Sequence, residues 1–185
     1  MANTIHLQTP LQTKDLEPLK VGDKILISGT VYTARDAAHK RLVELLEQGK
    51  ELPFDIRGQI IYFVGPSPAP PGKPIGSAGP TTSYRMDPYS PTLMDAGLKG
   101  MIGKGPRGQA VIDSMVKNKA VYFAAIGGAA VVTAQSVKSA KVIAYEDLGA
   151  EAIRELKVEN FPAFVANDTQ GNDVFKVGVE EYSRE

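Results

Sequence analysis

Lys24-Ile-Leu-Ile-Ser-Gly-Thr-Val-Tyr-Thr33 is the stretch of sequence that decides the fold class. The run is apolar and rich in β-branched residues, and it therefore predicts a buried β-strand. Residues 35–47 follow at once with helical spacing, because Ala38 and three leucines share one face and Gly49 ends the pattern. A strand followed directly by a helix is the repeating unit of α/β domains.

The same alternation continues along the chain. Strands are predicted at residues 58–64, 100–103, 120–125 and 141–145, and helices at residues 90–97, 109–118 and 150–156. Two last strands, 161–166 and 173–177, should form a hairpin around Asn167-Asp-Thr-Gln-Gly-Asn172. The whole chain, residues 1–185, is therefore predicted to form one layered α/β domain.

The composition excludes several classes of protein. The 21 basic and 21 acidic residues balance, so no overall charge favours nucleic acid or a membrane surface. The sequence has no cysteine and two histidines, which excludes disulfides, thiolate metal sites and a histidine-rich metal centre. It also shows no apolar run of membrane-spanning length and no signal peptide, so we expect a cytoplasmic protein.

A loop rich in proline and glycine covers residues 65–80 and is too long for a passive connection. It leads directly into Gly79-Pro-Thr-Thr-Ser-Tyr-Arg-Met-Asp87. Arg85 could grip a carboxylate bidentately, and the hydroxyl of Thr81, Thr82 or Ser83 could hold substrate or move a proton. The alternative is an ordinary turn, because Gly, Pro, Thr and Ser are all common loop residues.

A second candidate motif is Thr33-Ala-Arg-Asp-Ala-Ala-His39, at the predicted start of a helix. Thr33 and Asp36 have the spacing of a capping box. Arg35 is unfavourable at a helix start unless an anion binds there, since the helix dipole is already positive at that end. The alternative is a surface arginine followed by a half-buried His39 bonded to the backbone.

The third motif is Gly103-Lys-Gly-Pro-Arg-Gly108, which lies between a predicted strand and a predicted helix. Its glycine spacing is formally that of a dinucleotide fingerprint. Pro106 removes a backbone donor from the phosphate-binding turn, and the next strand ends without an acidic residue for a ribose. Nucleotide binding is therefore the weaker interpretation of this segment.

Together these motifs resemble the β subunit of class I, iron–sulfur-dependent fumarases and tartrate dehydratases. The likeness includes Gly127-Gly-Ala-Ala130 and extends from Leu7-Gln-Thr-Pro-Leu11 to the turn at Asn172. It implies that Thr81 exchanges the carbon-bound proton of the substrate. It also implies that the substrate carboxylates are bound by three cations, Arg35, Arg85 and Lys104. Supporting roles are implied for Asp36, His39, Thr82 and Asp87.

The resemblance also implies a swivelling β/β/α domain of the class I fumarase C-terminal type. A [4Fe-4S] cluster would be bound by a cysteine-bearing α subunit in a hetero-oligomer, in agreement with the missing cysteines of this chain. The implied reaction interconverts fumarate plus water and (S)-malate. Arg-Met-Asp87 favours fumarate over tartrate, which stays open as the alternative.

Two interpretations from other classes also remain. One is a nucleotide-binding α/β domain that uses the segment from Gly103 to Gly108. The other is a non-catalytic domain that scaffolds a partner. The sequence begins with Met1 ahead of the first family element, from which we expect a separate subunit.

Overall fold

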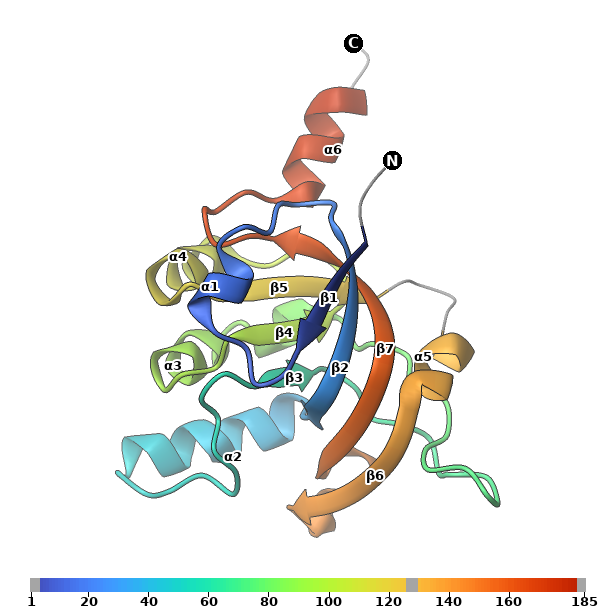
Figure 1. Ribbon diagram of the computed structural model, residues 1–185. Coiled ribbons are helices and arrows are strands. Elements are labelled where there is room, and N and C mark those ends of the chain that lie inside the picture. Colours follow the sequence, from blue (N-terminus) through green and yellow to red (C-terminus); the bar gives the residue numbers. More distant parts are fainter. Residues whose placement is uncertain (1–3, 126–129, 183–185) are drawn as a thin grey trace.

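The computed structural model describes residues 4–125 and 130–182 (Figure 1). Its strands are β1 (Thr4–Gln8), β2 (Lys24–Thr33), β3 (Ile60–Tyr62), β4 (Gly100–Gly103), β5 (Val121–Ala125), β6 (Val137–Ala144) and β7 (Ile153–Asn167). Its α-helices are α1 (Thr13–Leu16), α2 (Asp36–Glu47), α3 (Ser90–Asp95), α4 (Gln109–Asn118), α5 (Ala130–Ser136) and α6 (Val174–Tyr182). Two 3-10 helices are η1 (Ser83–Met86) and η2 (Glu146–Glu151). None of the described helices has the length and apolar character needed to cross a membrane.

The strand pairings close a ring. Strands β2, β3, β4 and β5 follow one another in parallel, and β7 pairs antiparallel with both β5 and β2. Phe164 of β7 shows the closure directly, because it pairs with Lys24 of β2 and with Ala124 of β5. Strand β1 adds in parallel to β2, and β6 adds to the first half of β7. In Figure 1 the long, curved β2 and β7 lie across from the shorter β3, β4 and β5.

Side chains that alternate along the strands divide the core in two. Ile27 of β2, Tyr62 of β3 and Phe161 of β7 belong to the cluster between the two groups of strands. Residues of the opposite pleat belong to a second cluster, which Leu42 of α2 and the apolar faces of α3 and α4 complete. Helices α2, α3 and α4 therefore cover one β layer, as Figure 1 shows. The period of two in the strands and of about 3.6 in the helices accounts for this division.

The predicted α/β class is confirmed, and many predicted elements lie at or near their observed positions. Strands 24–33 and 100–103 and the helix 109–118 have the predicted bounds. The predicted helix at 150–156 is wrong, because β7 begins at Ile153 and η2 precedes it. Pairing of β7 with β2 and β6 overrides the helix propensity of this Ala-, Leu- and Glu-rich segment.

The predicted C-terminal hairpin is also wrong. Residues Asn167 and Asp173 form one isolated bridge, but the chain then enters α6. The carboxylate of Asp168 accepts bonds from the backbone N–H groups of Gln170 and Asn172, which makes the turn. Asp173 accepts a bond from the N–H of Phe175 at 2.9 Å, so its carboxylate favours the start of a helix instead of a second strand.

The loop at 65–80 is anchored at both ends. The N–H of Ser67 donates to the carbonyl of Ser77 at 3.0 Å, and the N–H of Ser77 donates back to Ser67 Oγ at 2.7 Å. Ile75 and Ala78 are buried in the core between the β layers, and the hydroxyl of Tyr62 donates to the Ala78 carbonyl. These contacts give the Gly79–Asp87 motif a fixed starting point.

Candidate active site

The three sequence motifs meet where β2, β3 and β4 end. The N–H of Ala34 donates to the carbonyl of Tyr62 at 3.1 Å, which joins the Thr33–His39 motif to the end of β3. The N–H of Thr81 donates to Phe63 O at 2.7 Å, and Thr82 forms a parallel bridge with Lys104. The carboxyl ends of neighbouring parallel strands are where α/β folds bind ligands. The structure therefore brings the predicted site residues to one edge of the domain.

Arg35 lies at the N-cap of α2, and its Nε is 3.2 Å from Oε1 of Glu151. Gly65 leaves room for it, since a Cβ at that position would lie 2.9 Å from Arg35 Nη1. Glu151 was not among the predicted site residues; it is the last residue of η2 and lies in the segment wrongly predicted as a helix. The predicted capping box at this helix is wrong, because Thr33 Oγ1 accepts a bond from the N–H of Arg154 at 3.1 Å.

Arg85 donates to Asp36 Oδ2 at 3.0 Å, and both side chains are partly exposed. This ion pair joins the second motif directly to the first. The other oxygen, Asp36 Oδ1, is buried and has no hydrogen-bond partner among the described residues. Asp36 therefore orients Arg85 and is itself held at the start of α2, where the helix dipole favours an anion.

His39 is completely buried, whereas the alternative interpretation had it half-buried. Its Nδ1 lies 2.8 Å from the carbonyl of Arg35, and its ring packs edge-on against Phe63. Burial lowers the pKa of His39 to about 4, outweighing the bond to the carbonyl. His39 is therefore neutral near pH 7, with Nδ1–H donating to Arg35, and it contributes no positive charge to the site.

The depressed pKa of His39 predicts a stability loss in mild acid. The unfolded chain takes up a proton near pH 6.5, while the folded chain resists protonation until about pH 4. The contribution is therefore fully present above pH 6.5 and declines by on the order of 3 kcal/mol as the pH falls to 4. Chemical unfolding of wild type and His39→Gln across this range should show a difference that shrinks with acid.

The exposed second histidine supplies the control for this experiment. His6→Gln should keep the wild-type pH dependence, because His6 lies on the surface of β1. Parallel curves for wild type and His39→Gln between pH 4 and 6.5 would contradict a buried, neutral His39.

Lys104 and Thr81 present their side chains differently. Lys104 is exposed at the end of β4, while its carbonyl accepts a bond from the N–H of Ser83 at 3.0 Å. Thr81 is half-buried, and its backbone bond to Phe63 fixes where the side chain begins. A hydroxyl and three cations, Arg35, Arg85 and Lys104, thus share one end of the sheet.

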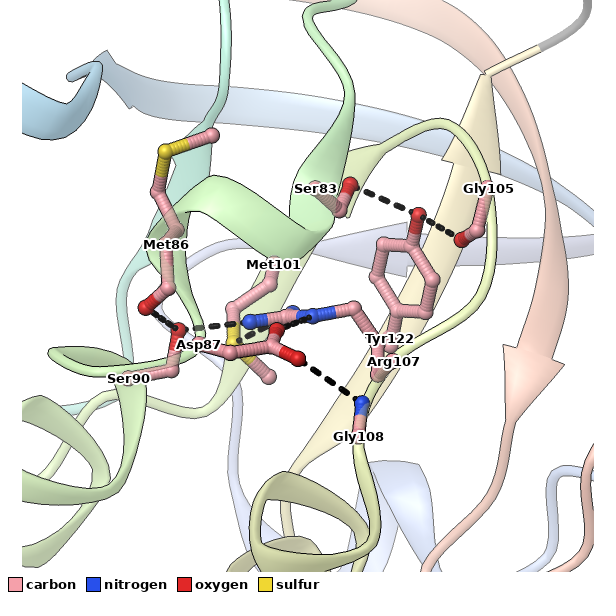
Figure 2. Close-up of polar contacts among 9 residues, drawn as sticks. All are labelled: Ser83, Met86, Asp87, Ser90, Met101, Gly105, Arg107, Gly108 and Tyr122. Atoms are coloured by element: carbon pink, nitrogen blue, oxygen red, sulfur yellow. Dashed lines mark hydrogen bonds and ion pairs between the residues drawn. The ribbon is translucent and has the colours of Figure 1, made fainter.

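Asp87, the last residue of the motif, is half-buried and is held by hydrogen bonds to other parts of the chain. Its Oδ1 accepts a bond from Arg107 Nε at 2.7 Å, and its Oδ2 accepts one from the N–H of Gly108 at 2.8 Å (Figure 2). Gly108 is the N-cap of α4, so a carboxylate of the protein already occupies the position where a nucleotide phosphate would bind. This geometry counts against the dinucleotide interpretation, and it makes Asp87 a structural support.

Arg107 and Tyr122 also belong to this region, and no sequence pattern pointed to either of them. The side chain of Arg107 is fully buried, although it follows Pro106 in a glycine-rich turn that suggests exposure. Tyr122 lies in an apolar strand that gives no sign of a polar role. The family-like Gly127 to Ala129 lie outside the described residues. No group of three His, Cys, Asp or Glu residues able to hold a metal occurs in the described part of the chain.

Comparison with known proteins agrees with the motifs. The model of the Fumarase C-terminus family matches residues 1–178. The anaerobic class I fumarate hydratase of Escherichia coli (strain K12) is 44% identical over 176 residues, which are 93% of this chain and 32% of that protein. Mitochondrial fumarate hydratase 1 of Leishmania major is 39% identical over 93% of this chain and 32% of its own length.

A shorter relative aligns over most of its length. The putative L(+)-tartrate dehydratase subunit beta of Methanocaldococcus jannaschii is 37% identical over 172 residues, 90% of this chain and 88% of that protein. The chain thus spans about a third of the fumarate hydratases that it matches but nearly all of this subunit. The predicted resemblance is confirmed: the chain belongs to the Fumarase C-terminus family, whose members include class I fumarate hydratases and a tartrate dehydratase beta subunit.

Proposed function

We propose that this chain is the β subunit of a hydro-lyase that interconverts fumarate plus water and (S)-malate. The observation that carries the proposal is the Arg85–Asp36 ion pair together with the Thr82–Lys104 bridge. These two contacts place Arg85 and Lys104 at one edge of the sheet, together with Arg35 and Thr81, which adjoin Asp36 and Thr82 in sequence. Family membership supports the same reaction, since several relatives are named fumarate hydratases.

The charges of the site suit a dicarboxylate. Arg35, Arg85 and Lys104 supply three positive charges, and Glu151 and Asp36 offset two of them in the resting chain. We assign the three cations to the two substrate carboxylates, because arginine binds such groups bidentately and lysine as a point charge. The resident acids hold the arginine side chains in place until substrate carboxylates take over part of their bonding.

Thr81 is assigned the proton transfer at the substrate carbon. Its hydroxyl holds its proton tightly, so it needs a neighbouring base or cation to become competent. Two cations lie close to Thr81 in the chain or the sheet. Arg85 follows it by four residues, and Lys104 pairs in a bridge with the adjacent Thr82. His39 and Thr82 support this arrangement, one by holding the start of α2 and the other by pairing with the segment of Lys104.

The residues of this chain do not fit an iron–sulfur cluster. The sequence contains no cysteine, and thiolates are the usual ligands of such clusters. We therefore assign the [4Fe-4S] cluster to a cysteine-bearing α subunit, where it would supply a Lewis acid toward the substrate hydroxyl. The name of the tartrate dehydratase subunit beta implies an alpha partner for that relative, which supports a hetero-oligomer here.

Two further assignments belong to the same proposal. The two β layers with one helix layer support a swivelling β/β/α domain of the class I fumarase C-terminal type. We also propose that residues 1–185 form one domain and that the protein is located in the cytoplasm. Tartrate is the second candidate substrate, because a relative that this chain covers almost completely carries that name.

The proposal is tested by anaerobic assays of this chain alone and co-purified with the cysteine-bearing subunit. We expect fumarate hydration by the pair and none by the chain alone, because the site is shared. A panel containing L-tartrate separates the two candidate substrates. If a pair with an intact cluster turns over neither fumarate nor L-tartrate, the proposal is contradicted. Binding of a nucleotide to the chain alone would instead support a nucleotide site at Gly103–Gly108.

A further inference from the structure

A buried tyrosine links the two loops that bear the proposed site residues. Tyr122 lies in β5 and is inaccessible to solvent. Its hydroxyl donates to the carbonyl of Gly105 at 2.8 Å. Ser83 Oγ lies 2.8 Å from the Tyr122 hydroxyl oxygen (Figure 2). Burial raises the pKa of Tyr122 to about 12, so the phenol stays a neutral donor. One hydroxyl thus connects the loop of Thr81 to the loop of Lys104.

Arg107 makes a second connection a short distance away. Its Nε donates to Asp87 Oδ1 at 2.7 Å, and its Nη2 donates to Ser90 Oγ at 2.6 Å. The guanidinium lies between two aromatic rings, 5.2 Å from the centre of Phe63 and 5.0 Å from that of Tyr122. Figure 2 shows the group in the interior between the two loops. Such a buried cation is tolerated because its donors and both faces have partners.

The backbone repeats the same connection. The N–H of Ser83 donates to Lys104 O, and Thr82 pairs with Lys104 in a bridge. Gly103 must stay small, because a Cβ there would clash with Ser83 Oγ. The two loops are therefore joined by backbone, hydroxyl and ion-pair contacts, and none of these contacts uses the side chains of Thr81, Arg85 or Lys104.

We propose that Arg107 and Tyr122 are positioning residues that set the separation between Lys104 and the Thr81–Arg85 segment. The proposal rests on the function proposed above, since it assigns these two segments to one dicarboxylate. Neither residue touches substrate in this scheme. Both act through Asp87, Ser83 and Gly105. Because they fix the loops before substrate binds, the entropic cost of ordering the loops does not add to the barrier of the reaction.

The first test measures the loops themselves in the full chain, without a partner. Tyr122→Phe removes one oxygen and leaves the ring in place. Amide hydrogen exchange at Ser83 and Gly108 should become about fivefold faster or more, because the two loops lose a shared bond. The control for a small loss of overall stability is Ile25→Val, a core substitution near the start of β2 and away from the two loops. In this variant the exchange rates of Ser83 and Gly108 should change no more than those of the other amides.

The second test measures turnover of the complex with the cluster-bearing partner. Tyr122→Phe should lower kcat about 10- to 100-fold, because small misplacements of reacting groups have effects of this size. Arg107→Met should lower it at least as far, and Arg107→Lys should restore part of the loss by keeping the charge without the planar fork. Ile25→Val should keep wild-type kcat at temperatures well below its unfolding.

The two tests separate the failure of this inference from the failure of the proposed function. Wild-type exchange at Ser83 and Gly108 in Tyr122→Phe would overturn the positioning role, whatever the complex does. Faster exchange with unchanged kcat and KM would overturn it as well. An inactive wild-type complex would reject the hydro-lyase function, while the exchange result would still decide whether Tyr122 fixes the two loops.

Discussion

Thr81→Ala is expected to lower kcat for fumarate hydration by the complex about 10²- to 10⁴-fold, with a smaller effect on KM. Proton transfer by a positioned side chain contributes an acceleration of about that size. Because the backbone N–H of Thr81 is bonded to Phe63 O, the substitution should remove the hydroxyl without moving the chain. Steady-state assays in both directions measure the effect.

Two variants control this result. Thr81→Ser keeps a hydroxyl at the same place and should retain much more activity than Thr81→Ala. Thr92→Ala removes a half-buried threonine of α3 and should leave kcat unchanged. If Thr81→Ala turns over at the wild-type rate, the proton must be moved by another group, and the assignment of Thr81 fails.

The second large effect concerns Arg85. Arg85→Met should lower kcat/KM for malate about 10- to 100-fold, mainly through KM, because it removes charge-assisted hydrogen bonds to a substrate carboxylate. It also leaves Asp36 without its cation, which adds repulsion toward an anionic substrate. Kinetics over a wide range of malate concentrations separate kcat from KM.

Arg41 provides a matched control for Arg85. It too pairs with an aspartate, Asp147, through two hydrogen bonds instead of one, but on an exposed part of α2 that bears no motif. Arg41→Met should therefore leave both kcat and KM near wild type. Equal losses in Arg41→Met and Arg85→Met would point to a general effect of charge and would contradict a specific carboxylate ligand.

Local sequence was sufficient for elements whose hydrophobic period is unambiguous. The strand Lys24–Thr33 and the helix Gln109–Asn118 have clear apolar faces and clear ends, and both have the predicted bounds. Strand β7 was partly missed because its first residues favour a helix, and only pairing with β2 decides otherwise. Strand β1 was not predicted at all, and its short segment depends on pairing with β2 as well.

The site shows the same division. Arg35, Thr81, Arg85 and Lys104 stand in motifs at strand ends, so their place at one edge could be expected. The roles of Glu151 and Arg107 could not be predicted, because each depends on an ion pair with a residue far away in sequence. Their partners are set by the return of β7 along β2 and by the packing of two loops, and short sequence patterns do not carry this information.

The closed strand ring has a consequence for how such a domain can be inherited. The five ring strands, β2, β3, β4, β5 and β7, find their hydrogen-bond partners within this chain, and one core cluster fills the space between them. A unit that completes its own sheet and core can be built into chains of different length. Segments similar to this chain make up 32% of the anaerobic fumarate hydratase and 88% of the putative tartrate dehydratase subunit beta, as expected of such a unit.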